Sequence, residues 1–458
     1  MKDFFNRFFK LDEHNTNIKT EVIAGMTTFM TMAYILVVNP NILCESGMDK
    51  NAVFTATVLA STIATLLMVL LANLPFVLSA GMGLNAYFTY TVVKQMGCSW
   101  QLALAAVFTE GIIFIILSVT NVREAIFNAI PKPIKMGVTV GIGLYIAMIG
   151  LKTAGIIISD KDTLVRLLSF KIWGPQTCAA LLAMFGILIT GILMHKKVTG
   201  SILFGILITW LLGMICEVTG LYVPNADLNL NSVIPREFIS TKFSLAPTLG
   251  GFIQGFKEIP LTYSGFLSFF SILFAFLFVD LFDTLGTLIG CASSGNMLDK
   301  DGRLPGIKGA LTADAIGTTL GAALGTSTVT TFVESASGIG AGGRTGLTAL
   351  TASGLFFISL FFSPIFLTVP AFATAPALVM VGYLMVTQVT KINFEDPTDA
   401  VPAYISFISM PFFYSISEGI SFGIISYCFI NLISGNRQKI HPLIYILSFL
   451  FILKYALI

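Results

Sequence analysis

Phe266-Leu-Ser-Phe-Phe-Ser-Ile-Leu-Phe-Ala-Phe-Leu-Phe-Val-Asp280-Leu-Phe-Asp283-Thr-Leu-Gly-Thr287 is long and apolar enough to cross a bilayer, yet it contains two aspartates. A charged side chain near the centre of a spanning helix costs about 2.5–3.5 kcal/mol on insertion scales. Asp280 and Asp283 are spaced i and i+3, so they share one face of a helix. Carboxylates this costly usually line a polar path, bind a ligand or carry protons, so the segment indicates a membrane transporter.

The overall composition excludes a soluble globular protein. Over 458 residues the chain is 55% hydrophobic and 11% charged, whereas an ordinary soluble domain is about 25% charged. The net charge of +2, with no basic run among aromatic residues, does not suggest a nucleic-acid partner. The six cysteines are scattered without a C-x-x-C pair, so neither a disulfide framework nor a zinc site is expected, and no cofactor is implied.

Apolar segments of about 20 residues, the length that crosses a bilayer, recur in two series. The first lies near 22–40, 52–74, 100–119, 133–150, 175–194 and 198–216, and the second near 263–289, 308–325, 346–368, 371–388, 399–415 and 418–434. Two shorter Gly-rich stretches, at 79–96 and 328–343, bring the total to about fourteen membrane elements, seven in each series. We therefore expect an all-α polytopic membrane protein.

These series give the expected division of the chain. It consists of a cytoplasmic N-terminal segment 1–21, a first repeat 22–216, a connecting external loop 217–261, a second repeat 262–434 and a C-terminal segment 435–458. The apolar run 442–458 is left over. It is a fifteenth span, an interfacial helix, or a sign that one helix around Pro411 has been divided in two.

The distribution of basic residues favours a cytoplasmic N-terminus. The segment Phe4–Leu11 is amphipathic and is expected to lie on the cytoplasmic membrane surface. With this orientation the cytoplasmic loops contain Arg123, Lys132, Lys135, Lys196, Lys197, Lys300, Arg303, Lys308, Arg437 and Lys439. The external loop 151–172 is an exception, because it also carries basic residues: Lys152, Lys161, Arg166 and Lys171, partly balanced by Asp160 and Asp162.

Three weak internal matches fall at corresponding places in the two series. They are Gly200-Ser-Ile-Leu-Phe-Gly-Ile with Gly419-Ile-Ser-Phe-Gly-Ile, the spacing of Pro131 to Gly143 with that of Pro370 to Gly382, and Ala80-Gly-Met-Gly with Ser337-Gly-Ile-Gly. With an odd number of elements before the connection, the halves enter the membrane from opposite sides. Together these features predict an inverted repeat.

Each series also contains a predicted break. The stretch Gly325–Glu334 is dominated by β-branched residues, which favour extended backbone, and Ser335–Arg344 after it can open a helix. In the first series, Leu74–Ser79 is followed in the same way by Ala80–Phe88. Unpaired backbone is tolerated inside a membrane only where it lines a cavity or pairs with another segment. We therefore expect two short strands that pair near the membrane centre and aim both half-helices at one site.

Several of these features have a structural alternative. Gly-rich stretches in membrane proteins are usually helix-packing surfaces, although the adjacent Glu334 is not needed for packing. Asn85 is either a helix cap or a ligand contact. Asp280 and Asp283 could form a self-satisfied polar network or pair with Arg or Lys, although no cation lies nearby in the sequence. Arg344 is expected at the cytoplasmic edge or in an ion pair. The spacing G-x-G-x-x-G at 338–343 lacks the later acidic residue of a dinucleotide site, so we reject that interpretation.

Three motifs closely resemble the AzgA-type purine permeases, a branch of the nucleobase–cation symporter superfamily that also holds the uracil and xanthine permeases. They are Ala80-Gly-Met-Gly-Leu-Asn-Ala-Tyr-Phe88, Phe278-Val-Asp-Leu-Phe-Asp-Thr-Leu-Gly-Thr287 and Thr330-Thr-Phe-Val-Glu-Ser-Ala-Ser-Gly-Ile339. The likeness runs from Leu11-Asp-Glu-His14 to His441-Pro-Leu443, almost the whole chain.

The resemblance implies two inverted seven-helix repeats arranged as a core and a gate domain, with proton-linked uptake of hypoxanthine, guanine or adenine. By motif it assigns binding or transport roles to Asn85, Asp280 and Glu334, with Asp283 a further matching carboxylate. The sequence departs from the uracil-permease branch in having Asp280 where that branch carries Glu and in lacking its neighbouring His. The resemblance therefore leaves open which group takes the proton. A homodimer is implied as a partner, beside purine, protons and the lipid bilayer.

The expected chemistry follows from the purine. A 6-oxopurine offers an N–H donor beside an acceptor oxygen, and charge-assisted hydrogen bonds to a carboxylate are the stronger kind. We expect Glu334 or Asp280 to accept from ring N–H groups, while backbone N–H groups near Gly83 or Ser335 donate to the oxygen. Proton coupling is expected at Asp280, Glu334 or Asp283. A passive channel, an intramembrane hydrolase and a sulfate or bicarbonate carrier of the same fold are the rival interpretations, and the carboxylates disfavour an anion.

Overall fold

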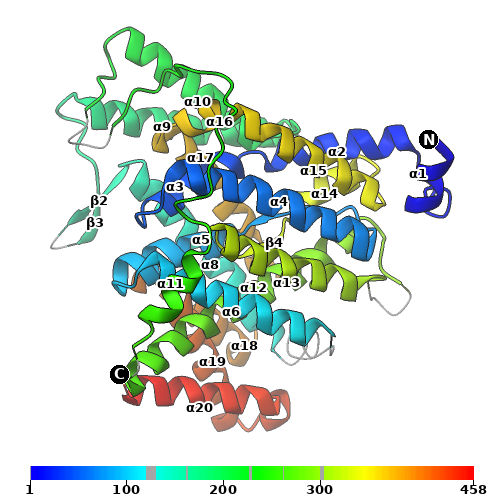
Figure 1. The fold of residues 1–458 in the computed structure, drawn as a ribbon. Coiled ribbons are helices and arrows are strands. Elements are labelled where there is room, and N and C mark those ends of the chain that lie inside the picture. The colour runs from blue at the N-terminus through cyan, green and yellow to red at the C-terminus, as the bar shows by residue number, and fades with distance from the viewer. Residues whose placement is uncertain are drawn as a thin grey trace.

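The computed structural model describes residues 2–119, 130–160, 163–225, 230–260, 262–299 and 304–457. Five residues that entered the orientation argument lie outside these ranges: Arg123, Lys161, Asp162, Lys300 and Arg303. In Figure 1 the long helices run roughly parallel, with the N-terminus at one end of the bundle and the β2–β3 hairpin at the other.

The expected spans are present with boundaries close to those predicted. The first repeat contains α2 (Ile18–Met32), α3 (Ile35–Cys44), α4 (Lys50–Ala72), β1 (Leu78–Ala80), α5 (Met82–Ala86), the π-helix η1 (Tyr87–Gln95), α6 (Trp100–Val119), α8 (Lys132–Thr153), α9 (Pro175–His195) and α10 (Ser201–Val218). The second contains α12 (Tyr263–Ser294), α13 (Ile307–Leu324), β4 (Val329–Thr331), α14 (Ser335–Gly340), α15 (Gly346–Ser359), η3 (Leu360–Phe362), α16 (Ser363–Thr368), α17 (Ala371–Val386), η4 (Thr387–Lys391), α18 (Pro397–Phe413) and α19 (Ile416–Ile433).

The remaining elements lie outside the repeats or in their loops. They are α1 (Lys2–Phe9), the strands β2 (Ile157–Asp160) and β3 (Leu164–Leu167), α11 (Gly251–Glu258), η5 (Arg437–Lys439) and α20 (Pro442–Leu457). The β2–β3 hairpin and α11 fall in segments that the sequence analysis treated as connections. Within the described residues, ten helical segments are long and apolar enough to cross a membrane.

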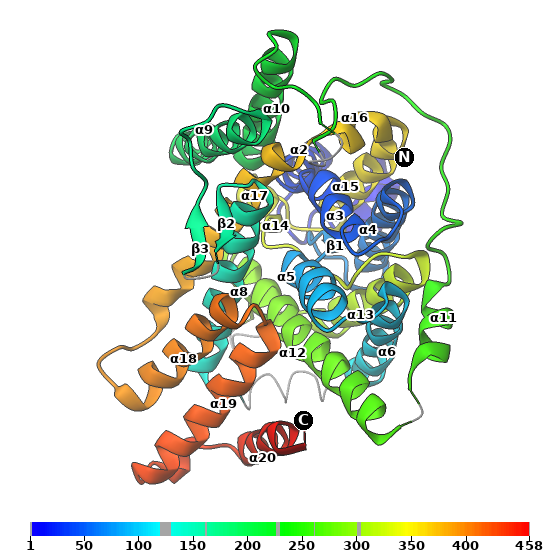
Figure 2. The same cartoon turned by 90° about the vertical axis from the view of Figure 1, so that its left-hand side faces the viewer.

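The helices form a core domain and a gate domain. In the core, α13 packs against α4 and α6, and α15 packs against α2 and α4. In the gate, α17 packs against α8 and α9, and α18 packs against α8 and α19. Figure 2 shows the gate helices on the left and the core helices on the right, with α12 between them.

The repeat symmetry is visible at the crossing of α8 and α17. Gly143 and Gly382, which follow matching prolines at the same spacing, lie directly against each other. A Cβ added at Gly382 would be 2.4 Å from the Gly143 carbonyl oxygen, and one added at Gly143 would be 2.7 Å from the Gly382 carbonyl oxygen. The absence of side chains therefore lets the two backbones meet.

The C-terminal helices resolve part of the question about residues 442–458. α18 and α19 form an antiparallel hairpin in which Asn431 donates to the Thr398 carbonyl at 3.0 Å, so the suggestion of one helix divided around Pro411 is wrong. α20 then returns along α19, because the Tyr455 hydroxyl near its end bonds to Glu418 at the start of α19. Its Phe451 also meets Phe274 of α12 at 5.5 Å. α20 is thus a separate helix on the outside of the bundle (Figure 1).

Candidate functional site

The two predicted strands pair at the point where the broken elements meet. β1 and β4 are antiparallel, with Ser79 opposite Thr330. The pairing extends beyond the strands, since Gly81 N donates to Thr328 O at 2.9 Å and Phe332 N donates to Val77 O at 3.0 Å. This pairing gives the backbone N–H and C=O groups of the extended segments hydrogen-bond partners inside the protein, as the membrane interior requires.

The half-helices that follow these strands begin differently. In α14 the first N–H groups are already bonded locally: Ser335 N donates to Phe332 O at 3.1 Å and Ala336 N to Val333 O at 3.0 Å. The Ser335 hydroxyl accepts from Val77 N at 3.1 Å, so this side chain fastens the two breaks together. In α5, by contrast, the first three backbone N–H groups, including that of Gly83, have no backbone hydrogen-bond acceptor among the described residues.

Gly83 lies against the gate domain. A Cβ added there would be 2.8 Å from Cγ2 of Ile142 on α8. The start of α5 is therefore placed at the boundary between the two domains, where relative motion would change its surroundings.

Two carboxylates, Asp283 and Glu334, are half-buried near the same point. Glu334 immediately precedes α14, and its Oε1 accepts a 2.6 Å hydrogen bond from the hydroxyl of Tyr34. Asp283 Oδ2 lies 3.6 Å from the position of an added Cβ at Gly81, next to α5. Asp283 interacts electrostatically with Asp314 of α13 and, more weakly, with Glu334. The structure thus places Asp283 and Glu334, both predicted from the sequence, beside the two breaks.

Asp280 occupies a different, fully buried position one turn earlier on α12. Thr284 Oγ1 lies 3.0 Å from Asp280 Oδ1, 2.9 Å from Asp314 Oδ1 and 2.6 Å from Thr330 Oγ1. Asp314, on α13, is also fully buried. We call Asp280, Thr284, Asp314 and Thr330 the buried aspartate cluster. It connects α12 and α13 directly to strand β4.

Asp314 and a further buried carboxylate, Glu110 of α6, were not predicted from the sequence. Thr328, just before β4, donates to Glu110 Oε2 at 2.9 Å. Both acids lie within apolar helices, and the insertion-cost argument used for Asp280 applies to them equally. That signal alone could have found them.

Asn85 is fully buried within α5, and Gly81 rather than Asn85 is the cap residue, so the capping interpretation is wrong. Its amide donates weakly to Ala80 O at 3.4 Å, while its Oδ1 has no partner among the described residues. A buried amide oxygen without a partner is costly, and a ligand N–H would satisfy it. Tyr87, two residues further on, packs edge-on against Phe276 at 4.9 Å, so it is a core residue.

Arg344 is bonded to backbone carbonyls, and no ion pair of its guanidinium is found among the described residues. Its guanidinium donates to Ile339 O at 2.6 Å and Gly343 O at 2.7 Å, near the C-terminal end of α14. Its backbone N–H donates to buried Glu21 of α2 at 2.9 Å. The Glu21 carboxylate also accepts from Thr348 Oγ1 at 2.6 Å, so it holds the start of α15.

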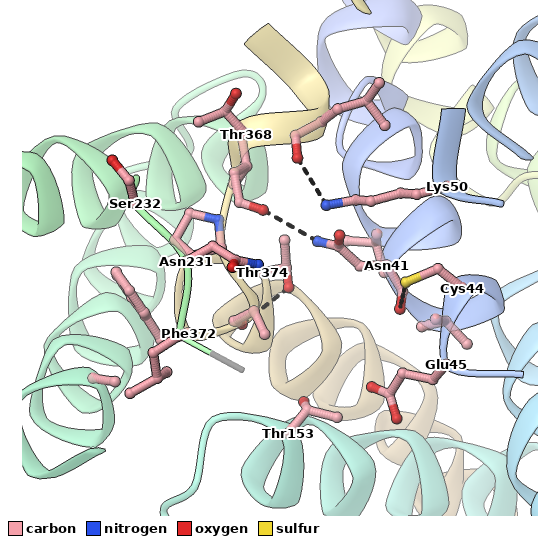
Figure 3. Close-up of a pocket in the computed structure, with 18 of the residues that line it drawn as sticks. Asn41, Cys44, Glu45, Lys50, Thr153, Asn231, Ser232, Thr368, Phe372 and Thr374 are labelled. Atoms are coloured by element: carbon pink, nitrogen blue, oxygen red, sulfur yellow. Dashed lines mark hydrogen bonds between the residues drawn. The ribbon is translucent and has the colours of Figure 1, made fainter. Parts of the chain in front are cut away.

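A cavity of about 1560 Å³ opens between the core and gate domains at the face opposite the N-terminus. We call it the vestibule. Figure 3 shows its polar lining, where Asn41 donates to Val369 O at 3.4 Å and Lys50 donates to Leu367 O at 2.7 Å. Val38, one turn of α3 beyond Tyr34, lines the vestibule. Its N–H donates to the Tyr34 carbonyl at 3.0 Å. α3 therefore connects the vestibule wall to the carboxylates.

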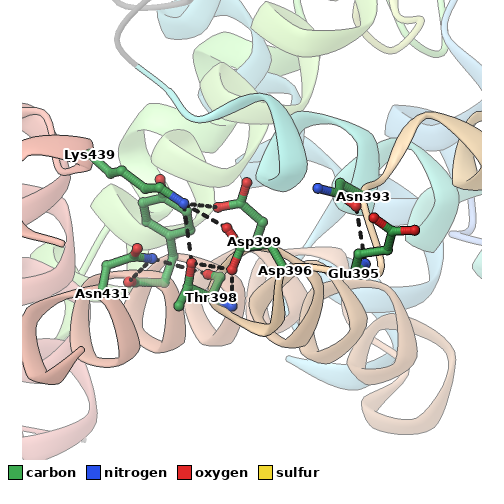
Figure 4. Close-up of polar contacts among 8 residues, drawn as sticks. Asn393, Glu395, Asp396, Thr398, Asp399, Asn431 and Lys439 are labelled. Atoms are coloured by element: carbon green, nitrogen blue, oxygen red, sulfur yellow. Dashed lines mark hydrogen bonds and ion pairs between the residues drawn. The ribbon is translucent and has the colours of Figure 1, made fainter. Parts of the chain in front are cut away.

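A charged cluster fastens the gate hairpin at the N-terminal face (Figure 4). Lys439 Nζ lies 2.7 Å from Asp396 Oδ2 and 3.7 Å from Asp399 Oδ1. Hydrogen bonds from Lys439 and Thr398 lower the pKa of Asp396 to about 2, and the bond to Asp396 raises the pKa of Lys439. The cluster joins the start of α18 to the segment after α19.

Comparison with known proteins places this arrangement in a family. The Permease family model, Xan_ur_permease, matches residues 19–422. The chain belongs to this permease family. It is 40% identical to the adenine permease AdeP of Escherichia coli K12, covering 99% of this chain and 96% of that protein. It is 42% identical to the guanine/hypoxanthine permease PbuG of Bacillus subtilis, covering 98% of each.

Solved structures show the same fold at low identity. The transmembrane domain of the cyanobacterial bicarbonate transporter BicA superposes with a TM-score of 0.62 at 14% identity, covering 88% of this chain and 96% of that one. Family and fold together identify a multi-pass membrane transporter of two inverted seven-helix repeats rather than an enzyme. The expected resemblance to nucleobase permeases is confirmed.

Proposed function

We propose that this permease is a proton-coupled importer of the purine nucleobases hypoxanthine and guanine, and of adenine as a third candidate. The observation that carries the proposal is the position of two carboxylates at the chain breaks: Asp283 lies beside Gly81 before α5, and Glu334 immediately precedes α14. Full-length relatives named as adenine and guanine/hypoxanthine permeases support the substrate class.

The recognition chemistry follows from the side chains at this point. Glu334 is the first candidate to accept from the N1–H of a 6-oxopurine, because one of its oxygens is already oriented by Tyr34. The N–H of Gly83 is a candidate donor to O6, whereas that of Ser335 is already engaged. The unpartnered Oδ1 of Asn85 is a further acceptor for a ring or exocyclic N–H.

The buried aspartate cluster supports the proton-coupled part of the proposal. Thr284 contacts Asp280, Asp314 and Thr330, and every such oxygen–oxygen contact needs a hydrogen between its atoms. The two hydroxyls supply only two hydrogens for three contacts. We infer that one of the two aspartates carries a proton in this conformation. Asp280 is then the proton-coupling candidate, with its neighbour Asp283 facing the substrate beside Glu334.

Transport would follow from motion of the core against the gate. Neutralising a carboxylate removes much of the cost of moving it through a dry interior, so a bound proton permits the shift. We further propose repeat boundaries at 22–216 and 262–434, an N-terminus in the cytoplasm, a vestibule that opens to the outside, residence in the cytoplasmic membrane and a homodimeric assembly.

Uptake of labelled hypoxanthine by cells that express the protein tests this function. We expect saturable accumulation that a protonophore abolishes and that excess guanine competes away, whereas uracil does not. Accumulation that survives the protonophore would refute proton coupling. Uptake that no purine inhibits would refute the substrate class.

An anion carrier is the alternative, because BicA shares the fold. The carboxylates beside the breaks disfavour it, since they would repel bicarbonate or sulfate in a poorly solvated site. Purified protein in vesicles that moves bicarbonate but not hypoxanthine would favour the alternative.

A further inference from the structure

Tyr34 joins the first span to the candidate substrate site. It lies at a turn between α2 and α3, and its side chain is almost fully buried. Its hydroxyl donates to Glu334 Oε1 at 2.6 Å, a contact between residues 300 positions apart in the chain. Bonds of this length to an ionised acceptor are about twice as strong as neutral ones.

The first span is broken at the place that makes this contact. Ala33 N still bonds to Phe29 O at 2.8 Å, but after the turn the ladder restarts, with Val37 N donating to Tyr34 O at 3.1 Å. The break turns the Tyr34 side chain toward the junction of β4 and α14, where Glu334 lies. The first span thus contributes a third interrupted element to the site.

We propose that Tyr34 is a positioning residue for Glu334: it holds Oε1 so that Oε2 faces the ring N–H of the purine. This inference rests on the proposed function, in which Glu334 accepts that N–H. A carboxylate attached to a mobile side chain loses rotamer freedom when it binds a ligand, and a fixed partner on one oxygen reduces that loss. Because α3 also forms the vestibule wall, the phenol ties Glu334 to the entry side of the site.

The test compares two ligands on purified full-length protein. Hypoxanthine carries the N1–H, whereas 1-methylhypoxanthine lacks it and cannot use Glu334 in the proposed way. We expect Tyr34→Phe to raise the Kd for hypoxanthine about threefold to tenfold, the loss expected when one side chain must be ordered on binding. The Kd for 1-methylhypoxanthine should change less than about twofold, so the discrimination between the two ligands falls.

The matched control is Tyr427→Phe. It removes one hydroxyl from another buried ring, which lies on α19 away from the vestibule and from both chain breaks. This variant should leave both affinities unchanged. Each ratio is taken on one preparation, so a partly unfolded sample cannot imitate the effect.

The outcomes separate the two proposals. Equal weakening of both ligands in Tyr34→Phe, or no weakening of either, overturns the positioning role while the proposed function stands. Wild-type protein that binds neither ligand overturns the proposed function itself. In uptake assays, the positioning role predicts a raised KM with a maximal rate within about twofold of wild type, and a lowered maximal rate at unchanged KM contradicts it.

Discussion

Replacing Thr284 by Val tests the buried aspartate cluster. Val keeps the shape of Thr but removes the hydroxyl that lies 3.0 Å from Asp280 and 2.9 Å from Asp314. A hydrogen bond to a charged group contributes about 1.5–3 kcal/mol, which corresponds to roughly tenfold to a hundredfold in an equilibrium constant. The substitution removes the bridge between the two aspartates, one of which we propose to be protonated, while the half-buried carboxylates beside the breaks keep their contacts.

The assay must separate proton coupling from substrate binding. In proteoliposomes with an imposed proton gradient, we expect Thr284→Val to lose concentrative hypoxanthine uptake by about tenfold or more. Exchange of internal for external hypoxanthine, which needs no net proton movement, should persist. Thr284→Ser restores the hydroxyl and should recover the gradient-driven uptake.

A single result would refute this reasoning. If Thr284→Val accumulates hypoxanthine as wild type does under the same gradient, the hydroxyl bridge has no part in coupling. Loss of exchange and of concentrative uptake together in a folded Thr284→Val protein would instead place the cluster in substrate binding.

Three further predictions concern other parts of the molecule. Glu334→Gln should give a folded protein that cannot concentrate labelled purine, and wild-type accumulation would contradict its role. Gly382→Ala should lower stability by about 1–3 kcal/mol in a detergent melting experiment, because the added Cβ would lie 2.4 Å from a carbonyl oxygen. Gly354→Ala should not, because nothing lies within 4 Å of its added Cβ. Equal melting curves for the two variants would contradict the tight crossing of α8 and α17. The lowered pKa of Asp396 means that its contacts add stability above its unfolded pKa of about 3.9 and that this stability is lost as the pH falls through about 2. Lys439→Met should reduce that acid dependence, with the contribution of Thr398 remaining, and an unchanged pH–stability curve would argue against the pair.

The spans and the paired strands could be predicted from local sequence. The β-branched run before Glu334 favours extended backbone, and the structure places β4 within it. The break at Ala33 and Tyr34 could not be predicted, because the Gly and Pro of that apolar segment, Gly25 and Pro40, lie elsewhere in it. It coincides with a hydrogen bond to a residue 300 positions away, and such a contact leaves no trace in a window of one helix.

Most acidic residues of the candidate site could be predicted from the sequence, but which of them lie close together could not. Asp280 and Asp283 share a helix face, and the sequence analysis treated them as one pair. In the structure Thr284 links Asp280 to Asp314, whereas Asp283 lies beside Gly81 and interacts with both Asp314 and Glu334. Which neighbour each acid meets depends on how α13 and β4 pack against α12, and spacing along one helix carries no information about that packing.

The two halves of the chain contribute different groups to the proposed site, in spite of their inverted symmetry, and this difference suits a purine. The second half supplies the carboxylates Asp283 and Glu334, which accept hydrogen bonds, while the first half supplies the Tyr34 phenol and the open N–H groups at the start of α5. A 6-oxopurine presents an N–H donor and a carbonyl acceptor on adjacent atoms, so it needs an acceptor and a donor that come from different directions. A fully symmetric pair of half-helices would offer donors on both sides and would suit an anion instead. The divergence of α5 and α14 is therefore the structural difference we expect to separate a purine site from an anion site on this fold.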